Sequence, residues 1–470
     1  MTMLIKGGTV VSATGTTEAD VLVDGEIIVA LLAPGSDVAS SVERGDAEIV
    51  DATGMLVVPG GVDAHTHMEV PFGPTRASDT FETGTRAAAW GGTTTIIDFA
   101  VQTKGQEIRP CLDTWLAKAD GACAIDYAFH MIVGDVDDAS LAMMDTLVDE
   151  GITSFKLFMA YPGVYYTDDG QLLKAMQTAA GNGAVIMMHA ENGIAIDVLA
   201  EQAVARGETD PVHHGYARRA ELEAEATFRA IQLATVAGAP LYIVHLSCSE
   251  ALEVVAQARS RGRNVFAETC PQYLYLNLED HLGAPGFAGA GYVCSTPLRT
   301  RHEHHHRDLW HGLRMNTLSV VATDHCPFCM KGQKDLGIGD FRAIPNGIGG
   351  VEHRMDLMYQ GVVAGELTLP RWVELCSTTP ARMFGLYGRK GVIAPGADAD
   401  IVLYDTAAST TISAATHHMN MDYSAFEGTV VDGGVDTVIS RGRILIADGD
   451  YHGSTGHGRY LRRGLSQYLL

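Results

Sequence analysis

The sequence of 470 residues predicts an α/β protein: a (β/α)8 barrel, the TIM-barrel architecture, with a small β-sandwich domain formed from both chain ends. Three observations support this fold. Eight apolar runs alternate with amphipathic segments through the middle of the chain. Short β-like runs with glycine or aspartate at their turns occur near both ends. Ionisable residues gather where the apolar runs finish, as they do at the active end of a barrel.

The eight apolar runs predict the barrel strands, because near-continuous apolar strands are typical of a parallel sheet covered on both faces. They occupy residues 55–65, 92–100, 125–133, 152–160, 183–190, 240–247, 264–271 and 318–327. Apolar residues at helical spacing predict covering helices between several of them, at 111–120, 140–150, 220–238 and 249–262.

The two chain ends predict the second unit. Strand-like runs lie at 3–11, 19–32 and 47–58, and the same texture returns at 398–405 and 428–450. Because sheet edges need partners, we expect these runs to pair with one another. The predicted division is a small β-sandwich from residues 1–56 and 386–445, a barrel from 57–385, and a tail from 446–470. The tail indicates either a contact with a neighbouring subunit or disorder.

Charge and composition exclude several classes of partner. The chain has 33 basic and 57 acidic residues, a formal charge of −24, which argues against nucleic acid and anionic membranes. No run approaches the roughly 20 apolar residues of a membrane span. The first residues lack the apolar core of a signal peptide, and eight scattered cysteines indicate no disulfide framework. We therefore expect a cytoplasmic protein.

Histidines and an aspartate mark the ends of four predicted strands. His65 and His67 close the first run, and residues two apart on a strand point to the same side. His189, His245 and Asp324 end the fifth, sixth and eighth runs. Each residue alone is explained as well by a hydrogen-bonded position at the rim. Together, at one end of a barrel, they predict a site for divalent metal.

Lys156 lies inside the fourth run, within "GITSFKLFMAYPG" and without an acidic neighbour in sequence. Leaving a buried ion without its partner costs roughly 3 to 5 kcal/mol. An ammonium group has no lone pair and cannot bind metal. Either Lys156 extends to solvent, or its amine has reacted with carbon dioxide to give a carbamate that could bridge two metal ions.

At this point the chain resembles the dihydropyrimidinase and D-hydantoinase family of cyclic amidohydrolases, within the amidohydrolase superfamily. The resemblance runs in order from about residue 5 to about residue 440. Its motifs are "GGVDAHTHMEVPFG", "GGTTTIIDFA", "FKLFMAYPG", "MMHAENG", "VHLSC", "ETCPQYL", "CSTPLR", "ATDHCPF", "IPNGIGGVEHR" and "GADADIVLYD".

The resemblance implies two Zn²⁺ ions per subunit, bridged by carboxylated Lys156 and a hydroxide. One ion would be held by His65, His67 and Asp324, and the other by His189 and His245. Zinc suits imidazole and carboxylate ligands, although manganese or cobalt could replace it. The hydroxide would attack the ring amide carbonyl, with Asp324 as general base and then general acid.

The resemblance also implies residues that bind substrate. Tyr161 would stabilise the tetrahedral oxyanion through its hydroxyl group. Ser295 and Asn346 would hold the imide and urea edge of the ring, largely by backbone groups. Four further residues could form an apolar pocket for the ring substituent, or could pack the loops themselves: Met68, Phe72, Phe158 and Tyr165.

The expected reaction opens dihydropyrimidines (dihydrouracil, dihydrothymine) or 5-substituted hydantoins to N-carbamoyl amino acids, a step of pyrimidine catabolism, in a homotetramer. An allantoinase or dihydroorotase is the alternative within the superfamily. The carboxylate of dihydroorotate would need an arginine, and only Arg76 and Arg299 lie near the matched loops. A non-catalytic scaffold is a third hypothesis, but such relatives lack the full ligand set that is present here.

Two motifs favour structural interpretations. The tract His302 to His306 precedes an amphipathic pattern, so we interpret it as the solvated start of a helix instead of a metal tract. Cys326 and Cys329 form a Cys-x-x-Cys without a second pair at matching spacing, which indicates packing of the loop after Asp324.

Overall fold

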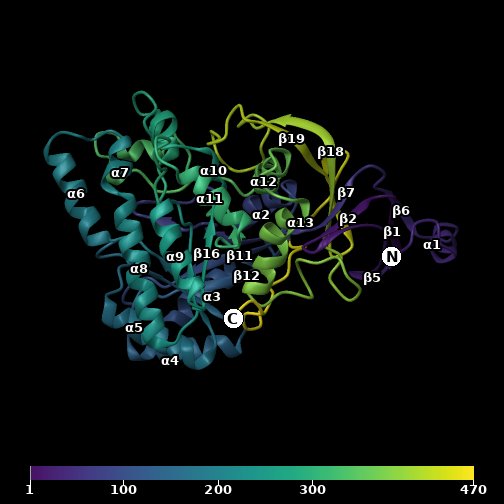
Figure 1. The fold of residues 1–470 in the computed structure, drawn as a ribbon, viewed down its shortest axis with the longest axis horizontal. Helices are drawn as coiled ribbons and strands as arrows, with labels where there is room; N and C mark the ends of the chain where they lie inside the picture. Colours follow the sequence, from purple (N-terminus) through teal and green to yellow (C-terminus); the bar gives the residue numbers. More distant parts are fainter. Residues whose placement is uncertain (1, 470) are drawn as a thin grey trace.

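The computed structural model describes residues 2–469. Eight parallel strands follow one another in chain order around a barrel (Figure 1). Each of the eight predicted runs supplies one of them: β8 (Gly61–Thr66), β11 (Thr93–Val101), β12 (Asp126–Ile132), β13 (Ser154–Phe158), β14 (Val185–His189), β15 (Leu241–Ile243), β16 (Val265–Thr269) and β17 (Val320–Val321). Every residue of these strands is buried, which explains their nearly continuous apolar character. The barrel closes just beyond β17, where Thr66 pairs with His325.

Helices surround the barrel and connect its strands: α2 (Phe81–Trp90), α3 (Ile108–Ala119), α4 (Asp138–Asp149), α5 (Asp169–Asn182), α6 (Gly193–Ala205), α7 (Val212–Ala217), α8 (Ala220–Ala237), α9 (Ser249–Ser260) and α11 (His305–Arg314). The four predicted helices are confirmed as α3, α4, α8 and α9. Local sequence fixes their ends. Helix α5, for example, starts at a capping box of Asp168 and Gln171 and stops at Gly183, whose φ of 79° suits glycine.

Longer connections follow β8, β16 and β17. A short hairpin after β8 consists of β9 (Pro71–Phe72) and β10 (Thr75–Arg76). The chain after β16 and β17 forms short helical segments: α10 (Pro271–Tyr275), η1 (Leu278–Leu282), η2 (Ala288–Tyr292), η3 (Lys334–Gly337), η4 (Phe341–Ala343), α12 (Arg354–Val363), α13 (Leu369–Val373), η5 (Glu374–Thr378) and α14 (Thr379–Met383). The three connections contribute residues of the β9 hairpin and of the loops around Ser295 and Asn346 to the walls of the site described below.

A smaller β domain with its own apolar core lies beside the barrel, at the right in Figure 1. Its four-stranded sheet has the order β5 (Ile27–Leu32), β4 (Asp20–Asp24), β1 (Thr2–Lys6), β6 (Glu48–Asp51). Its seven-stranded sheet has the order β21 (Asp450–Tyr451), β20 (Arg443–Ala447), β19 (Val430–Ser440), β18 (Ile401–Thr411), β7 (Leu56–Pro59), β2 (Thr9–Ser12), β3 (Gly15–Glu18). The two chain ends therefore pair, as predicted. Helix α1 (Asp37–Glu43) was not predicted.

The first predicted run belongs to two sheets. Strand β7 pairs with β2 and β18 in the small domain, whereas β8 begins the barrel. Gly60 separates them, and a Cβ atom at this position would lie 2.1 Å from the Thr94 side chain. The close approach requires glycine at this junction. The predicted domain boundary between residues 56 and 57 stays a prediction. It falls inside β7, whose pairing partners are strands of the small domain.

The tail from residue 446 begins in β20 and β21 of the small domain and then, from Gly458 onward, packs against its own barrel. Tyr460 pairs with Tyr127 at the start of β12, and Leu461 is buried. The buried guanidinium of Arg463 donates to the Phe129 carbonyl at 2.7 Å and to Ser154 Oγ at 2.8 Å. These contacts agree with an ordered tail, and a role in oligomer contacts stays a prediction.

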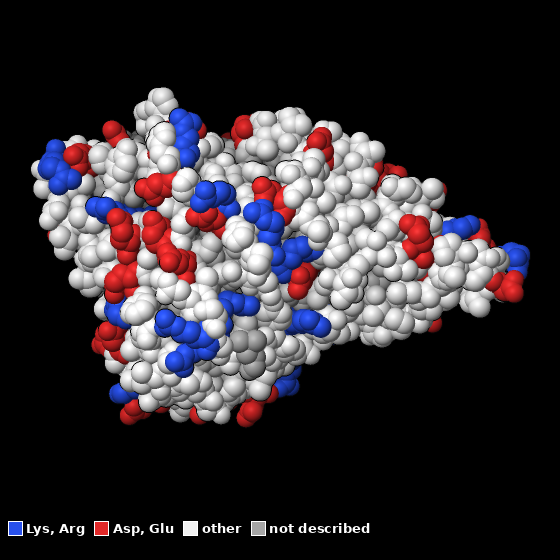
Figure 2. Space-filling view, viewed as in Figure 1, with Lys and Arg blue, Asp and Glu red and all other residues white. Residues whose placement is uncertain are grey.

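Surface and cysteine chemistry agree with the composition. Figure 2 shows acidic and basic side chains in several small groups of each sign over the barrel, and fewer charged side chains over the smaller domain at the right. No helix within residues 2–469 combines the length and apolar character needed to cross a membrane. All eight cysteines are free thiols, so the prediction that no disulfide framework exists is confirmed.

Candidate metal centre

Six predicted ligand residues come together at the carboxyl end of the barrel. His65 lies at the end of β8, Lys156 lies within β13, and His189 ends β14. The remaining three follow strands β8, β15 and β17 by one to three residues: His67, His245 and Asp324. All six are buried or nearly buried. Residues far apart in sequence therefore meet because parallel strands share one carboxyl edge.

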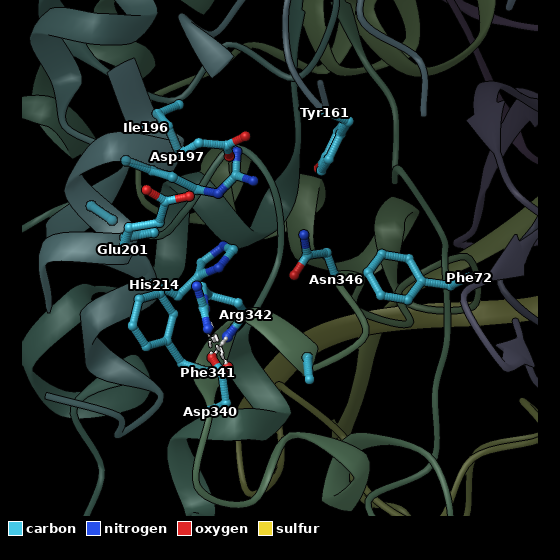
Figure 3. A pocket seen from close by; sticks show the side chains of 14 residues that line it. Phe72, Tyr161, Ile196, Asp197, Glu201, His214, Asp340, Phe341, Arg342 and Asn346 are labelled. Atoms are coloured by element: carbon cyan, nitrogen blue, oxygen red, sulfur yellow. Dashed lines mark hydrogen bonds and ion pairs between the residues drawn. The ribbon is translucent and has the colours of Figure 1, made fainter. Parts of the chain in front are cut away.

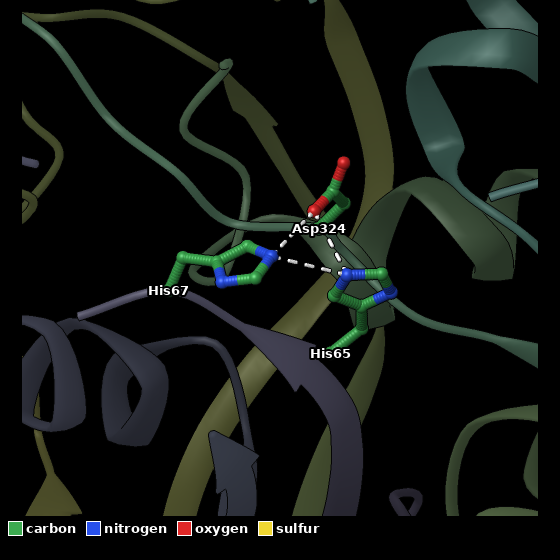
Figure 4. A group of neighbouring side chains, drawn as sticks. All are labelled: His65, His67 and Asp324. Atoms are coloured by element: carbon green, nitrogen blue, oxygen red, sulfur yellow. Dashed lines mark hydrogen bonds and ion pairs between the residues drawn. The ribbon is translucent and has the colours of Figure 1, made fainter. Parts of the chain in front are cut away.

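Three of these residues form a compact triangle (Figure 4). His65 Nε2 lies 3.2 Å from His67 Nε2 and 3.1 Å from Asp324 Oδ1. His67 Nε2 lies 3.3 Å from the same carboxylate oxygen. Ligands held at roughly 2.0 to 2.1 Å in a tetrahedral arrangement are about 3.3 Å apart, so the triangle has the size of one face of a zinc site.

The other three residues lie beside this triangle. His189 Nδ1 is 3.0 Å from His245 Nε2, and Lys156 Nζ is 2.8 Å from His65 Nε2. Lys156 is 1% exposed, and no carboxylate within residues 2–469 forms an ion pair with it. Burial lowers the pKa of Lys156 to about 8, so a larger fraction of this lysine is the neutral amine than of an exposed lysine. Its position excludes the alternative that this lysine extends to solvent.

Two buried glutamates orient the imidazoles. Glu268 accepts a short hydrogen bond from His65 Nδ1 and another from the Tyr242 hydroxyl at 2.8 Å. Glu191 accepts from His189 Nε2 at 2.7 Å and from Arg218 at 2.6 Å. Since a carboxylate can only accept, these nitrogens carry the protons. The opposite nitrogens, His65 Nε2 and His189 Nδ1, therefore direct lone pairs into the centre.

Protonation states agree with this donor set. Burial lowers the pKa of His67 to about 3 and holds the pKa of His245 well below its usual value, so both rings are neutral at pH 7. Burial favours the acid form of Asp324, but the facing His65 and His67 overcome this effect and hold its pKa well below the usual range. Neutral imidazoles and an ionised carboxylate are the forms that bind divalent metal. Burial lowers the pKa of His65, but Asp324 and Glu268 more than offset this effect and raise it, so the charged form of His65 must release a proton when a metal binds. The residues present fit a metal centre.

Backbone strain also marks the site. Tyr161, His245 and Asp324 have positive φ angles of 60°, 38° and 50°. A non-glycine residue held there costs on the order of 1 to 3 kcal/mol and persists only where its surroundings fix it. All three side chains face the same cavity.

A cavity of about 280 Å³ opens above the ligands. One wall is apolar and consists of Val70, Pro71, Phe72, Phe158, Val164 and Tyr165. The rings of Phe158 and Tyr165 stack at a centroid distance of 5.0 Å. Tyr161, Ser295 and Asn346 line the polar side. Met68 does not line the cavity. On a strand that directs His65 and His67 inward, Met68 points the other way, and it packs fully buried against Gly84 of α2.

The polar wall presents backbone groups without partners in the chain. Within residues 2–469, no hydrogen bond engages the N–H or the carbonyl of Ser295 or of Asn346. The carbonyls on either side of them are all engaged. Buried backbone groups nearly always have partners, so these groups are suited to receive a ligand. Burial raises the pKa of Tyr161, and the Ser295 and Asn346 side chains face its hydroxyl, which therefore stays protonated and able to donate.

A second cavity of about 450 Å³ adjoins the first and shares Phe72, Tyr161 and Asn346 with it (Figure 3). Its far side includes the carboxylates Asp197 and Glu201 of α6. Two arginines line it, and each is paired: Arg218 with Glu191, and Arg342 with Asp340 at 2.7 Å.

The two motifs that we interpreted as structural occupy separate places. Helix α11 begins at His305, which confirms a helix start for the histidine tract, but the prediction that this start is solvated is wrong for His305, which is buried against Ser249 of α9. The ligand atoms of His305, Glu250 and Glu303 lie near one another, but away from the barrel centre. Cys326 lines the cavity above the predicted metal ligands, whereas Cys329 is half-buried outside that cavity.

Glu268 and Glu191 were missed by the sequence reasoning. Glu268 ends the seventh apolar run in the same way that the histidines end theirs, and Glu191 follows His189 by two residues. Glu268 is therefore identified when every apolar run is searched for a polar residue at its end.

The fold and the site define a class: a (β/α)8 barrel with a candidate metal centre at the carboxyl ends of its strands. The model of the amidohydrolase family matches residues 56–445. The chain belongs to the amidohydrolase family, as its motifs predict.

Individual relatives cover nearly the whole chain. The chain is 61% identical to a D-hydantoinase of Streptomyces coelicolor over 99% of both chains. It is 46% identical to a D-hydantoinase of Geobacillus stearothermophilus over 98% of this chain and 97% of that one. Among solved structures, a dihydropyrimidinase from Brevibacillus agri NCHU1002 is 46% identical over 99% of both chains, with a TM-score of 0.95.

Proposed function

We propose that this protein hydrolyses the cyclic amide bond of 5-substituted hydantoins and dihydropyrimidines and releases N-carbamoyl amino acids. The observation that carries the proposal is the convergence of three imidazoles, a carboxylate and a buried lysine on one cavity with an apolar wall, with the fourth imidazole, His65, in contact with His67 and Lys156 beneath it. The names of the full-length relatives support the same reaction.

We propose two zinc ions as the resident metals, one at His65, His67 and Asp324 and the other at His189 and His245. Bound ions of this kind lower the pKa of water to roughly 7 and polarise a carbonyl oxygen. Lys156 supplies the anionic group between the two sets of ligands. Its neutral amine nitrogen bonds to the carbon of CO2 and releases one proton, which leaves a carbamate in place of a buried cation.

Asp324 moves the proton. Its ionised carboxylate lines the cavity and accepts the proton of the attacking water, then gives it to the ring nitrogen as the amide C–N bond breaks. Tyr161 donates its O–H to the oxygen of the former carbonyl as negative charge develops there. The backbone groups of Ser295 and Asn346 hold the imide and urea edge of the ring, because these groups have no partner within residues 2–469.

The apolar wall receives the ring substituent. Phe72, Phe158 and Tyr165 contribute to it, and Met68 does not. The wall favours an aliphatic or aromatic substituent over the polar ureido group of allantoin. No arginine within residues 2–469 lines this cavity: Arg299 is buried in an ion pair with Glu223, and Arg76 is exposed on β10. Dihydroorotase activity is therefore disfavoured, and the complete ligand set argues against a scaffold.

Ring opening of dihydrouracil and of 5-phenylhydantoin by metal-loaded protein tests the proposal directly. We expect both rings to open, with loss of ring absorbance and formation of the N-carbamoyl amino acid. If a sample with full metal content opens neither ring, the proposed function is wrong. Assembly as a homotetramer, a cytoplasmic location and a role in pyrimidine catabolism stay predictions.

A further inference from the structure

Lys334 is another buried lysine close to the cavity: its Nζ lies 5.9 Å from the centroid of the Phe328 ring, which packs edge-on against Phe72 of the apolar wall. It begins the short helix η3 after β17 and is 0% exposed. No carboxylate within residues 2–469 forms an ion pair with it. Burying an ammonium group without hydrogen-bond partners is unfavourable. The groups that bind the Lys334 side chain therefore indicate its role.

The partners of Lys334 are three backbone carbonyls. Nζ donates to the carbonyl oxygens of Val293 at 2.9 Å, Pro345 at 2.7 Å and Gly347 at 2.9 Å. Burial lowers the pKa of Lys334 to about 7; in the ammonium form Nζ has three N–H donors, and each then has one carbonyl acceptor. The carbonyls belong to two segments about 50 residues apart in sequence, which also bind each other through Gly347 N–H and the Val293 carbonyl at 2.9 Å.

These carbonyls stand directly beside the residues that face the ring. Pro345 and Gly347 flank Asn346, and Val293 lies two residues before Ser295. In an extended chain successive carbonyls point to opposite sides. When the carbonyls of Pro345 and Gly347 point to Lys334, that of Asn346 is turned the other way, toward the cavity that Asn346 lines. Of the carbonyls of Pro345, Asn346 and Gly347, that of Asn346 is the one that has no partner among the described residues.

The segment around Ser295 is held in a corresponding way. The Val293 carbonyl accepts from Lys334, the Cys294 carbonyl accepts from His214 Nε2 at 2.8 Å, and the Thr296 carbonyl accepts from the Tyr273 hydroxyl at 2.7 Å. The carbonyl of Ser295 is left for the cavity. Lys334 is the one of these donors that binds both segments, so it fixes them relative to each other.

We propose that Lys334 is a positioning residue of the reaction: its side chain holds the two carbonyls that flank Asn346 together with the Val293 carbonyl, two residues before Ser295, and so turns the Asn346 carbonyl toward the ring and fixes the Ser295 segment beside it. The inference rests on the proposed function and deepens it. Lys334 itself does not line the cavity and touches no metal ligand. It acts on ring binding, without a part in metal binding or in recognition of the substituent.

The test compares K334M, which keeps the length of the side chain without its donors, with K331M, the same change at an exposed lysine three residues earlier. Metal content per chain, KM and kcat are measured with dihydrouracil and with 5-phenylhydantoin. In K334M we expect wild-type metal content and a KM raised at least tenfold for both rings by a similar factor. In K331M we expect no change. Amide hydrogen exchange should speed up at 293–297 and 345–348 in K334M alone.

The outcomes separate the two proposals. If wild-type protein opens both rings and K334M does so with an unchanged KM, Lys334 has no positioning role, although the proposed function stands. If KM rises only for the phenyl substrate, or if metal content falls, the assigned role is also wrong. If loaded wild-type protein opens neither ring, the proposed function falls and this inference with it. Should K334M fail to fold, K334Q, which keeps two N–H donors, is expected to give an intermediate rise in KM for both rings.

Discussion

Glu268 offers the sharpest test of how the metal centre is organised. It is fully buried, and its carboxylate accepts hydrogen bonds from His65 Nδ1, from the Tyr242 hydroxyl and from the His245 backbone N–H at 3.2 Å. The bond to His65 decides which ring nitrogen carries the proton. Glu268→Gln keeps the shape of the side chain and removes its charge.

The expected loss follows from the contacts. A hydrogen bond to an ionised acceptor is roughly twice as strong as a neutral one, and a glutamine can also turn its NH2 group toward His65 Nδ1. Either change weakens the preference for the tautomer whose Nε2 lone pair faces the metal. Loss of such an orienting partner typically lowers metal affinity about 10- to 100-fold, which corresponds to about 1.4 to 2.7 kcal/mol.

The assay dialyses metal-loaded protein against increasing concentrations of chelator and measures metal per chain by atomic emission. In E268Q the midpoint should move to a chelator concentration about 10- to 100-fold lower, chiefly for the ion held by His65, His67 and Asp324. E352Q is the matched control. Glu352 also binds an imidazole, His418 Nδ1 at a distance of 2.8 Å, but this pair does not belong to the metal centre. An unchanged midpoint in folded E268Q would refute the role given to this glutamate.

Three other substitutions test separate parts of the site. Lys156→Ala should abolish ring opening and retention of two ions, with partial rescue by a short carboxylic acid; full activity without rescue would contradict a bridging carbamate. Tyr161→Phe should lower kcat on the order of 10²-fold with little change in metal content, since it removes one oxyanion donor, and an unchanged kcat would exclude this role. Phe72→Ala should lower kcat/KM about 10-fold for 5-phenylhydantoin and less than about twofold for dihydrouracil. The control F228A, at an exposed phenylalanine, should change kcat/KM for neither substrate. Equal losses for both rings would refute the apolar wall as the substituent site.

The fold could be predicted well because its signals are local. Each barrel strand is buried along its whole length, so it appears in the sequence as an apolar run. Each run ends at a rim position, where a polar residue such as His189 or His245 becomes visible. The first run was misleading only in its length, since β7 and β8 are both apolar and the glycine between them marks a change of sheet.

What could not be predicted depends on contacts between distant residues. The direction of Met68 follows from the pleat of a strand whose exact end the sequence does not fix. Glu191 is recognisable only when Arg218, 27 residues later, is seen to bind it. The three carbonyls bound by Lys334 are 41, 11 and 13 residues away from it, and backbone acceptors have no signature in a sequence.

Metal titration of the apoprotein tests the central claim most directly. Zinc would be added in steps to metal-free protein, in the presence of bicarbonate, while the ring opening of 5-phenylhydantoin is followed. We predict negligible activity without metal and a rise that saturates at two equivalents per chain. Saturation at one equivalent would contradict the binuclear centre, and ring opening at full rate in the metal-free protein would contradict the role of the metal ligands altogether.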